Sequence, residues 1–326
     1  MVDQFMKHQD PDGSPVVSII VVSYNTRDMT IECLRSIVRE TPEVSFEVLL
    51  IDNQSTDGSF EAIRDEFESD PRFTLVPSDR NLGFAGANNE MAKRARGRYI
   101  LLLNPDTVVT SRAIEGVIAF ANDSPSSQIW GGRTFYEDGV LNHGSCWGDY
   151  SIWSQLCRYS GLSRLAPRSS FFDPRTYGRW ERDSIREVAI VTGCFLLIEK
   201  KLWDQLGGFD PEFFMYGEEA DLCIRARSLG ARPAITPKAT LIHHGGASEP
   251  VHEDKIVRLL DGEIRLLRRH WGHLAFRINL LIVKGGVLLR RLLEGLRRSS
   301  KKGTWHKVWS RRGEWLRGAG KQVASQ

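Results

Sequence analysis

The first third of the chain alternates between short apolar runs and longer amphipathic stretches. Val17–Val22 and Glu47–Ile51 are nearly continuous apolar segments, and such runs are typical of strands buried on both faces. The same pattern predicts strands over Phe73–Val76 and Tyr99–Leu103, and helices from Thr26 or Asp28 to about Glu40, over Phe60–Phe67 and over Ala85–Arg96. Strands that alternate with helices of this length form βαβ units, which predicts an α/β fold with a mostly parallel sheet and right-handed crossovers.

The periodicity weakens in the middle of the chain and then returns. Residues 130–190 are rich in aromatic residues, glycine and arginine, which predicts long loops with short elements over a site. The apolar run Val188–Ile198 predicts a strand pair or one bent strand. Helices over Lys201–Leu206 and Glu219–Leu229, each followed by glycine, and a strand over Ala239–Ile242 complete the pattern.

The C-terminal part reads as helical. Leu274–Leu296 is apolar but is interrupted by Lys284 and two glycines, so it lacks the roughly 20 uncharged residues of a membrane span. Basic residues recur there every seven positions, with leucines on the other side of the helix. This predicts an amphipathic helix in the plane of a membrane surface, with tryptophans at the interface, namely Trp305, Trp309 and Trp315. The alternative is a helix packed on the catalytic domain.

Composition and charge narrow the class of protein. The 326 residues are 41% hydrophobic and 26% charged, as in a globular protein. The net charge is +3, but Lys284–Lys321 holds 12 Lys and Arg against two Glu, so this tail carries +10 and the remainder 3 − 10 = −7. A basic tail predicts an anionic partner surface, a membrane, rather than nucleic acid, because no nucleic-acid-binding signature accompanies it.

The cysteines and the N-terminus indicate the compartment. Five cysteines are scattered without a CxxC pair, which argues against a disulfide framework or a structural zinc site and fits a reducing cytosol. Residues 1–15 contain no apolar signal segment and are expected to form a flexible tail.

Polar residues follow three of the predicted strands: Ser23-Tyr24-Asn25, Asp52-Asn53-Gln54-Ser55 and Asn104-Pro105-Asp106. Ligands of parallel α/β sheets bind outside the carboxyl ends of the strands, so these tips are expected to form one site. Asp52 is a candidate acceptor for a base N–H or a ribose hydroxyl, or else a turn residue. Asp106 is a candidate ligand for a divalent cation on a diphosphate, or else part of a Pro-Asp turn. No G-x-G-x-x-G or Walker loop is present, which disfavours a dehydrogenase.

A second group of candidates lies later in the chain. Glu218, Glu219 and Asp221 stand at a predicted helix start, where they suit the helix dipole, but crowding could raise one pKa toward that of a general base. His243, in a His-His-Gly-Gly segment after a strand, is a candidate ligand or a structural histidine. The glycines of Arg80–Asn89 either allow close approach to a ligand or form an ordinary loop-to-helix joint.

Taken together, these segments resemble family 2 glycosyltransferases of the GT-A (Rossmann-like) fold, in particular the rhamnosyltransferase-like branch. The resemblance covers about residues 16–250 and rests on Val17–Asn25, Asp52–Gly58, Asn81–Asn89, Leu103–Asp106, Gly193, Gly207–Asp210, Phe214–Leu222 and the His243-x-x-Gly246-x-Ser248 stretch. It implies a catalytic domain over 16–250, with a nucleotide-sugar half at 16–110 and an acceptor half at 111–250. Residues 251–326 would form a basic amphipathic helical extension.

The resemblance also implies roles for residues. The donor nucleotide sugar would contact Ser23, Tyr24, Asn25, Asp52, Asn53, Ser55, Arg80, Asn81, Gly83, Asn104 and Asp106. Asp106 and His243 would hold Mg²⁺ or Mn²⁺. Glu219 would be the catalytic base, with Glu218 or Asp221 orienting it, and the acceptor would contact Thr192, Gly193 and Glu218.

Two departures from the family pattern affect these roles. Asn104 replaces the first acid of the usual Asp-x-Asp motif, which implies a looser metal site. Glu218-Glu219 replaces the usual Glu-Asp pair, so which of the two glutamates is the base stays open.

The implied reaction is sugar transfer with inversion, from dTDP-rhamnose by resemblance or from a UDP-sugar, to an acceptor on a polyprenyl diphosphate. The enzyme would work in the cytoplasm, peripherally on the inner face of the cell membrane, and an oligomer stays open. The rival functions are a sugar-1-phosphate nucleotidyltransferase and a non-catalytic glycan- or lipid-binding module.

Overall fold

The apolar runs of the N-terminal third form the parallel part of a central sheet. The computed structural model describes residues 13–245, 251–296 and 303–319. β1 (Val17–Ser23), β2 (Phe46–Asp52), β3 (Phe73–Pro77) and β4 (Tyr99–Leu103) lie in the order β3-β2-β1-β4, all parallel. Ser23 pairs with Asp52, so the polar residues after β1 and β2 emerge at the same edge of the sheet.

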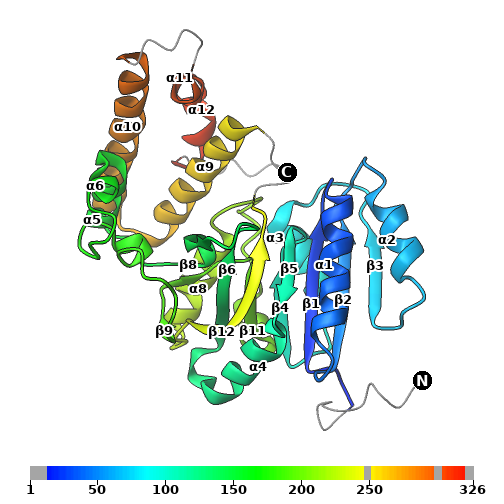
Figure 1. Ribbon diagram of the computed structural model, residues 1–326. Helices are drawn as coiled ribbons and strands as arrows, with labels where there is room; N and C mark the ends of the chain where they lie inside the picture. The colour runs from blue at the N-terminus through cyan, green and yellow to red at the C-terminus, as the bar shows by residue number, and fades with distance from the viewer. Residues whose placement is uncertain (1–12, 246–250, 297–302, 320–326) are drawn as a thin grey trace. The chain divides into compact units, whose positions relative to one another are not determined.

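The sheet continues with strands that are mostly antiparallel to their neighbours, except that β12 (Ala234–His243) runs parallel to β6 (Ile129–Phe135) (Figure 1). After β4 come β11 (Phe195–Glu199), β6, β12 and β5 (Thr107–Thr110). β12 pairs with β5 so that His243 lies opposite Thr107, next to Asp106 in the chain. This pairing brings the histidine of the second candidate group to the tip that follows β4.

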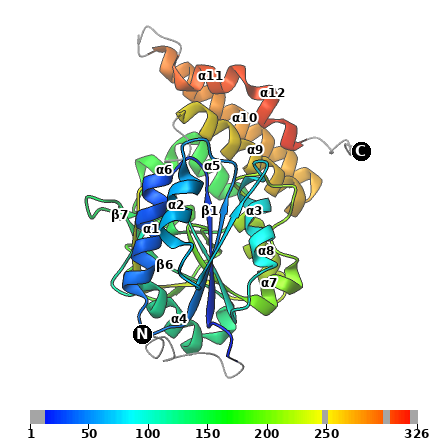
Figure 2. The same cartoon turned by 90° about the vertical axis from the view of Figure 1, so that its right-hand side faces the viewer.

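Helices cover both faces of this sheet. Figure 2 shows α1 (Arg27–Glu40) and α2 (Ser59–Phe67) on one face, and α3 (Gly83–Ala92), α7 (Lys200–Leu206) and α8 (Glu218–Ser228) on the other. α4 (Ala113–Asp123) contributes Ile114 and Val117 to the same core as Ile19 and Leu34, all four with no exposed surface. The α/β fold with a mostly parallel sheet is therefore confirmed.

One predicted helix ends earlier in the structure, and the segment for which two forms were expected forms two strands. α3 ends at Ala92 rather than Arg96, because the N–H of Arg96 donates to the buried Glu47 Oε1 (2.8 Å) and the chain turns there. The run Val188–Ile198 divides into β10 (Ile190–Val191), paired with β8 (Cys146–Trp147), and β11 in the main sheet.

The expectation of loops with only short elements over 130–190 is wrong for β6, a seven-residue strand inside the main sheet. Its signal is weak because it contains Gly131 and Gly132, and glycine lowers strand propensity. The backbone of Ala239 requires Gly132, since a Cβ there would lie 2.3 Å from the Ala239 carbonyl oxygen.

Contacts divide the chain into two units. The first spans Met1–Trp147, Glu181–Phe214 and Glu219–Ser248, and the second spans Gly148–Trp180, Met215–Glu218 and Glu249–Gln326. The second unit contains α5 (Ile152–Ser160), α6 (Leu162–Leu165), α9 (His252–His270), α10 (His273–Leu296), α11 (Thr304–Ser310) and α12 (Arg312–Trp315). Two segments from the middle of the chain thus cluster with the C-terminal helices.

The second unit has its own apolar core, formed by Tyr159, Val257, Leu260, Ile264, Val283, Val287, Val308 and Trp315. Trp315 has no exposed surface and its Nε1–H donates to the Val308 carbonyl (2.9 Å), so its predicted place at a membrane interface is wrong. None of the described helices combines the length and the apolar character needed to cross a bilayer.

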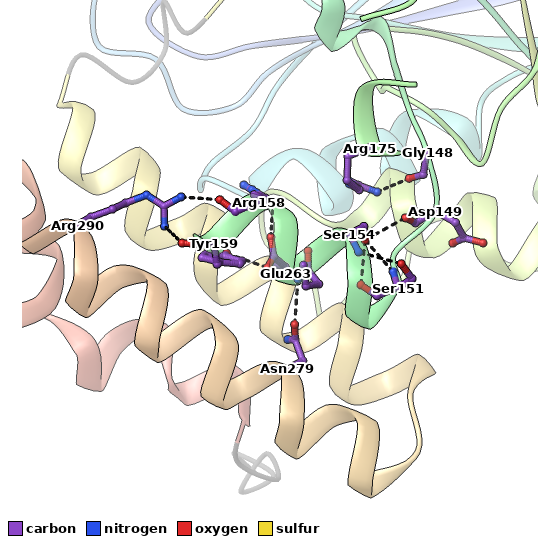
Figure 3. Close-up of polar contacts among 11 residues, drawn as sticks. Gly148, Asp149, Ser151, Ser154, Arg158, Tyr159, Arg175, Glu263, Asn279 and Arg290 are labelled. Carbon is purple, nitrogen blue, oxygen red and sulfur yellow. Dashed lines mark hydrogen bonds and ion pairs between the residues drawn. The ribbon is translucent and has the colours of Figure 1, made fainter. Parts of the chain in front are cut away.

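A buried polar network crosses this core (Figure 3). The Glu263 carboxylate is 6% exposed and accepts hydrogen bonds from Gln155 Nε2 (2.7 Å), Arg158 Nη1 (2.6 Å) and the Tyr159 hydroxyl (2.9 Å). Burial, and then the neighbouring carboxylate, raise the pKa of Tyr159. The network ties α5 to α9.

Candidate donor and catalytic site

Asp52, the last residue of β2, carries a carboxylate with one unused oxygen. Its Oδ2 accepts the N–H of Ser55 (2.9 Å), while Oδ1 is buried and has no hydrogen-bond partner in the described part of the chain. Leaving a buried acceptor unsatisfied costs about 1–3 kcal/mol. An N–H or O–H of a bound ligand would remove this cost, so the Oδ1 atom fits recognition of a polar donor group.

The residues after β1 shape the neighbouring tip. Ser23 is fully buried and its hydroxyl pairs with that of Thr30 (3.2 Å). Asn25 has a positive φ of 51°; its N–H donates to Ser55 Oγ (2.9 Å) and its Oδ1 accepts the N–H of Thr56 (2.8 Å). These bonds join the β1 and β2 tips into one surface, on which Tyr24 and Ser55 are half-buried.

Two asparagines fix the loop before α3. Asn53 Nδ2 donates to Asn81 Oδ1 (3.0 Å), and Asn53 Oδ1 accepts the N–H of Leu82 (2.8 Å). Asn81 Oδ1 also accepts the N–H of Gly83 (2.9 Å). The amides of Asn53 and Asn81 are therefore engaged in holding the loop, whereas Arg80 in the same loop is exposed.

Asp106 and His243 form a buried pair at the edge formed by β4 and β5. His243 Nε2 lies 3.3 Å from Asp106 Oδ1, and the side chains are 16% and 6% exposed. Burial opposes charge on the imidazole, but the Cys194 sulfur and the Asp106 carboxylate raise the pKa of His243 to about 10. Burial likewise opposes charge on Asp106, but the hydrogen bond and charge of His243 hold the pKa of Asp106 below its ordinary value.

Asn104 stands beside this pair and is held by its backbone. Its N–H donates to the Cys194 carbonyl (3.2 Å), and its carbonyl accepts the Thr107 hydroxyl (2.7 Å). Its half-buried side chain takes the place of the acid that an Asp-x-Asp motif would supply.

The segment 207–214 is held by α3. Asn89 binds both backbone groups of Phe209, with Nδ2 donating to its carbonyl (2.8 Å) and Oδ1 accepting its N–H (2.9 Å). The N–H of Phe84 donates to the Phe214 carbonyl (2.9 Å). Gly83 has a φ of +71°, and a Cβ there would lie 2.3 Å from the same carbonyl oxygen. The close backbone approach that Gly83 permits is thus to this chain's own Phe214.

The three acids of α8 have different surroundings. Asp221 has no exposed surface and pairs with Arg225 (2.6 Å), and Arg225 also donates to the carbonyls of Leu206 (2.9 Å) and Gly208 (2.8 Å). Glu218 is 3% exposed, whereas Glu219 is half-buried. Asp221 therefore joins α8 to the 206–208 turn, and Glu219 is the carboxylate that a substrate can reach more readily.

Two of the three residues predicted to contact the acceptor, Thr192 and Gly193, lie just before β11, and the third, Glu218, begins α8. The Thr192 hydroxyl donates to the Gly144 carbonyl (2.7 Å). Gly193 is packed on Phe84, with a Cβ position 3.1 Å from the Phe84 ring. Gly246 and Ser248 of the histidine motif lie outside the described residues.

Sequence reasoning gave no role to three residues that this geometry uses. Asn89 lay in a recognised motif, but its partner Phe209 is 120 positions away. Cys194 lies near His243 only in the fold. Arg225 could have been found, because it stands four residues after Asp221 on one helix and this spacing favours an ion pair.

Comparison with known proteins identifies the family. The sequence model of "Glycosyl transferase family 2" matches residues 18–188, more than half of the chain. The chain belongs to glycosyl transferase family 2. Among solved structures, the mannosyltransferase PcManGT of Pyrobaculum calidifontis, in complex with GDP-Man and Mn²⁺, has a TM-score of 0.57 at 17% identity, over 97% of this chain and 88% of that one. The expected family and the GT-A fold are confirmed.

Two relatives illustrate the range of the family. The chain is 28% identical over 243 residues to the N-acetylglucosaminyl-diphospho-decaprenol L-rhamnosyltransferase of Mycobacterium tuberculosis (strain H37Rv), covering 70% of this chain and 76% of that protein. It is 27% identical over 238 residues to the O-antigen biosynthesis protein RfbC of Myxococcus xanthus, covering 72% of this chain. The chain spans only 18% of the length of that second relative.

The Asp106–His243 pair fits a divalent cation that is also held by ligand phosphates. A carboxylate and an imidazole are acceptable ligands for Mn²⁺ or Mg²⁺. Among the described residues no group of three or more His, Cys, Asp or Glu is arranged to hold a metal, so this protein would supply two ligands and the remaining ones would come from the diphosphate and water.

Proposed function

We propose that this chain is an inverting glycosyltransferase that moves a sugar from a nucleoside diphosphate to a saccharide acceptor, with dTDP-rhamnose as the first donor to test. The main support is the sheet edge, where the unused Asp52 Oδ1 follows β2 and the Asp106–His243 pair follows β4, on either side of β1. Asp52 suits a base N–H, and the pair suits a cation-bound diphosphate. The rhamnosyltransferase relative supports the choice of sugar.

In the proposed mechanism, the strand tips hold the donor. Asp52 binds the base, and the surface of Tyr24, Asn25 and Ser55 borders the nucleoside, with the buried Ser23 beneath it. Asn53, Asn81 and Gly83 shape the loop that carries Arg80 toward the diphosphate, and Asn104 lies beside Asp106. Asp106 and His243 would hold Mg²⁺ or Mn²⁺, which neutralises the departing diphosphate when bound.

Glu219 is proposed as the base that takes the proton of the acceptor hydroxyl as the hydroxyl oxygen attacks the anomeric carbon. Its partial exposure supports it over the buried Glu218. Asp221 is proposed to position α8 through Arg225, and Thr192, Gly193 and Glu218 to border the acceptor. A single base and one displacement invert the anomeric carbon.

The proposed acceptor is a saccharide on a polyprenyl diphosphate in cell-surface polysaccharide synthesis. The printed names of the Mycobacterium tuberculosis and Myxococcus xanthus relatives support this choice. Such an acceptor lies in a membrane, so the proposed location is the cytoplasm, peripherally on the inner face of the cell membrane, with the C-terminal helices toward anionic lipid.

The test is release of nucleoside diphosphate from dTDP-rhamnose, UDP-sugars and GDP-sugars, with and without a chelator. Asp106→Ala and Glu219→Gln should each reduce transfer by about 10²–10⁴-fold. Glu219→Gln should leave thermal unfolding unchanged, whereas Asp106→Ala should also lower the melting temperature, because it leaves the buried His243 without its partner. The matched control is Asp65→Asn, an exposed surface acid, which should keep full activity. Transfer that persists in both site variants would show that the assigned site is wrong.

Two further outcomes distinguish the alternatives. An NMR time course should show the product with inverted anomeric configuration; retention would refute the one-base mechanism. Pyrophosphate release from a nucleoside triphosphate and a sugar phosphate would favour the nucleotidyltransferase instead.

A further inference from the structure

α10 has two unlike faces, and its inner face is held firmly. Val283, Gly286 and Val287 are buried in the core of the second unit. Gly286 lies so close to α5 that a Cβ there would be 2.6 Å from the Tyr159 Cβ. Asn279 has no exposed surface and accepts a hydrogen bond from Gln155 Nε2 (3.1 Å). These contacts fix the rotation of α10 about its axis.

Charged residues on the inner side strengthen this attachment. Arg290 donates to the carbonyls of Arg158 (2.8 Å) and Tyr159 (3.4 Å), as Figure 3 shows. Glu294, which is the only acid in the sequence of α10, accepts the N–H groups of Trp305 (3.3 Å) and His306 (3.1 Å) at the start of α11. The acid is therefore engaged with α11.

The opposite face is apolar and exposed. Its large side chains are Leu274 (74% exposed), Ile278 (40%), Leu281 (71%), Leu289 (41%), Leu292 (58%) and Leu296 (79%), here called the outer stripe. Their spacing of three, four or seven to eight residues keeps them on one side of a helix about 36 Å long. The stripe has no large side chain between Leu281 and Leu289. Gly285 lies in this gap, and no atom lies within 4 Å of the position that a Cβ would take there. An exposed apolar stripe of this length, broken only at Gly285, marks an interaction site.

Basic residues border the outer stripe. Arg277, Lys284 and Arg291 recur every seven residues, which places them roughly 80–120° around the helix from the centre of the stripe. Long basic side chains at that angle can lie along an apolar surface and extend their charges to the headgroups above it. An apolar stripe with cations beside it matches a lipid surface that carries negative charge.

We propose that the outer stripe of α10 inserts into the headgroup boundary of an anionic bilayer, with the helix parallel to the membrane. This proposal rests on the proposed function, which places the acceptor in a membrane. A second copy of the chain fits less well, because a two-fold contact along the stripe would bring the same cations of both copies together. Anionic lipid would attract those cations instead.

The experiment measures sedimentation of the full chain with vesicles of phosphatidylcholine, with and without phosphatidylglycerol. The double variant Leu281→Gln/Leu292→Gln should lower vesicle binding at least ~10-fold, because two side chains lose their burial in lipid. The matched control is Leu165→Gln in α6, a leucine that is 83% exposed outside the stripe, and it should bind as the unchanged protein does. Arg277→Gln/Lys284→Gln should weaken binding about fivefold per cation, only when phosphatidylglycerol is present.

Three readouts keep the proposal separate from the proposed function. Donor hydrolysis without acceptor should be the same in these variants as in the unchanged protein. If the unchanged protein hydrolyses no donor, the proposed glycosyltransferase activity is refuted, whereas the proposed lipid surface is not. Thermal unfolding should also be equal. The lipid surface is refuted if Leu281→Gln/Leu292→Gln binds vesicles normally, or if it converts a dimer into a monomer in light scattering while vesicle binding is unchanged.

Discussion

Replacing Asp221 by asparagine should destabilise the protein, whereas replacing Glu219 by glutamine should not. Asp221 has no exposed surface and lies 2.6 Å from Arg225, whose side chain is 19% exposed. Removing one partner of a buried ion pair costs about 3–5 kcal/mol, because the other charge stays buried without its counterion. We take the lower end, about 3 kcal/mol, because Arg225 keeps the carbonyls of Leu206 and Gly208 as acceptors.

The assay is thermal unfolding of the variants beside donor turnover. For a unit of this size, about 3 kcal/mol corresponds to a fall in melting temperature of roughly 6–12 °C. The kcat of Asp221→Asn should fall while its KM for the donor stays within about twofold, since the strand tips are unchanged. Glu219→Gln should keep the melting temperature and lose turnover.

A double-mutant cycle identifies the cause. Asp221→Asn/Arg225→Gln should be less destabilised than the sum of the two single variants by about 1–3 kcal/mol, because neither charge is then left without its partner. If Asp221→Asn keeps the melting temperature of the unchanged protein but loses all turnover, Asp221 acts in the chemistry and the positioning role is wrong.

Three further outcomes are expected. Gly83→Ala should lower the free energy of unfolding by more than about 2 kcal/mol, because its Cβ would lie 2.3 Å from a carbonyl oxygen. The control Gly58→Ala has a similar positive φ but open space around the Cβ, and it should cost only about 1 kcal/mol. Mn²⁺ affinity, measured by calorimetry, should rise up to about tenfold per pH unit from pH 6.5 toward the His243 pKa of about 10. The reason is that the metal must displace the imidazole proton. An affinity that does not depend on pH would exclude His243 as a ligand. Glu263→Gln should lower the melting temperature of the second unit, because it removes a buried carboxylate that accepts three hydrogen bonds. The control Glu253→Gln removes a surface pair with Lys307 and should change stability by at most about 1 kcal/mol. Equal effects of the two variants would contradict the role of the network.

The sign of the His243 effect on folding stability follows from its raised pKa. A folded-state pKa of about 10 against an ordinary 6.5 means that the pair stabilises the fold fully below about pH 6.5. That contribution declines as the pH rises toward 10. Asp106 has a lowered pKa, so its contribution is lost when the pH falls into the acid range.

The sequence by itself determined the elements that depend on local patterning. The strands β1, β2 and β4 are mostly apolar and fully buried, with Ser18 and Glu47 as the polar residues inside the first two, and such runs are typical of strands covered on both faces. Their polar tips follow directly from where each apolar run stops, so the amino-acid pattern alone is enough to single out Asp52 and Asp106 as candidates.

Only the tertiary structure decided how those candidates are used. Strand β6 was not predicted because it contains two glycines, and one of them, Gly132, is required by the close approach of Ala239, more than a hundred residues away in the chain. The pairing of β12 with β5 places His243 beside Asp106, and the pairing of Asp221 with Arg225 engages one of three similar acids. Likewise, the heptad spacing of basic residues in α10 predicts an amphipathic helix, but the contacts of Asn279 and Gly286 decide which face points outward. Local pattern specifies an element and its two faces, whereas long-range packing specifies the partner of each face.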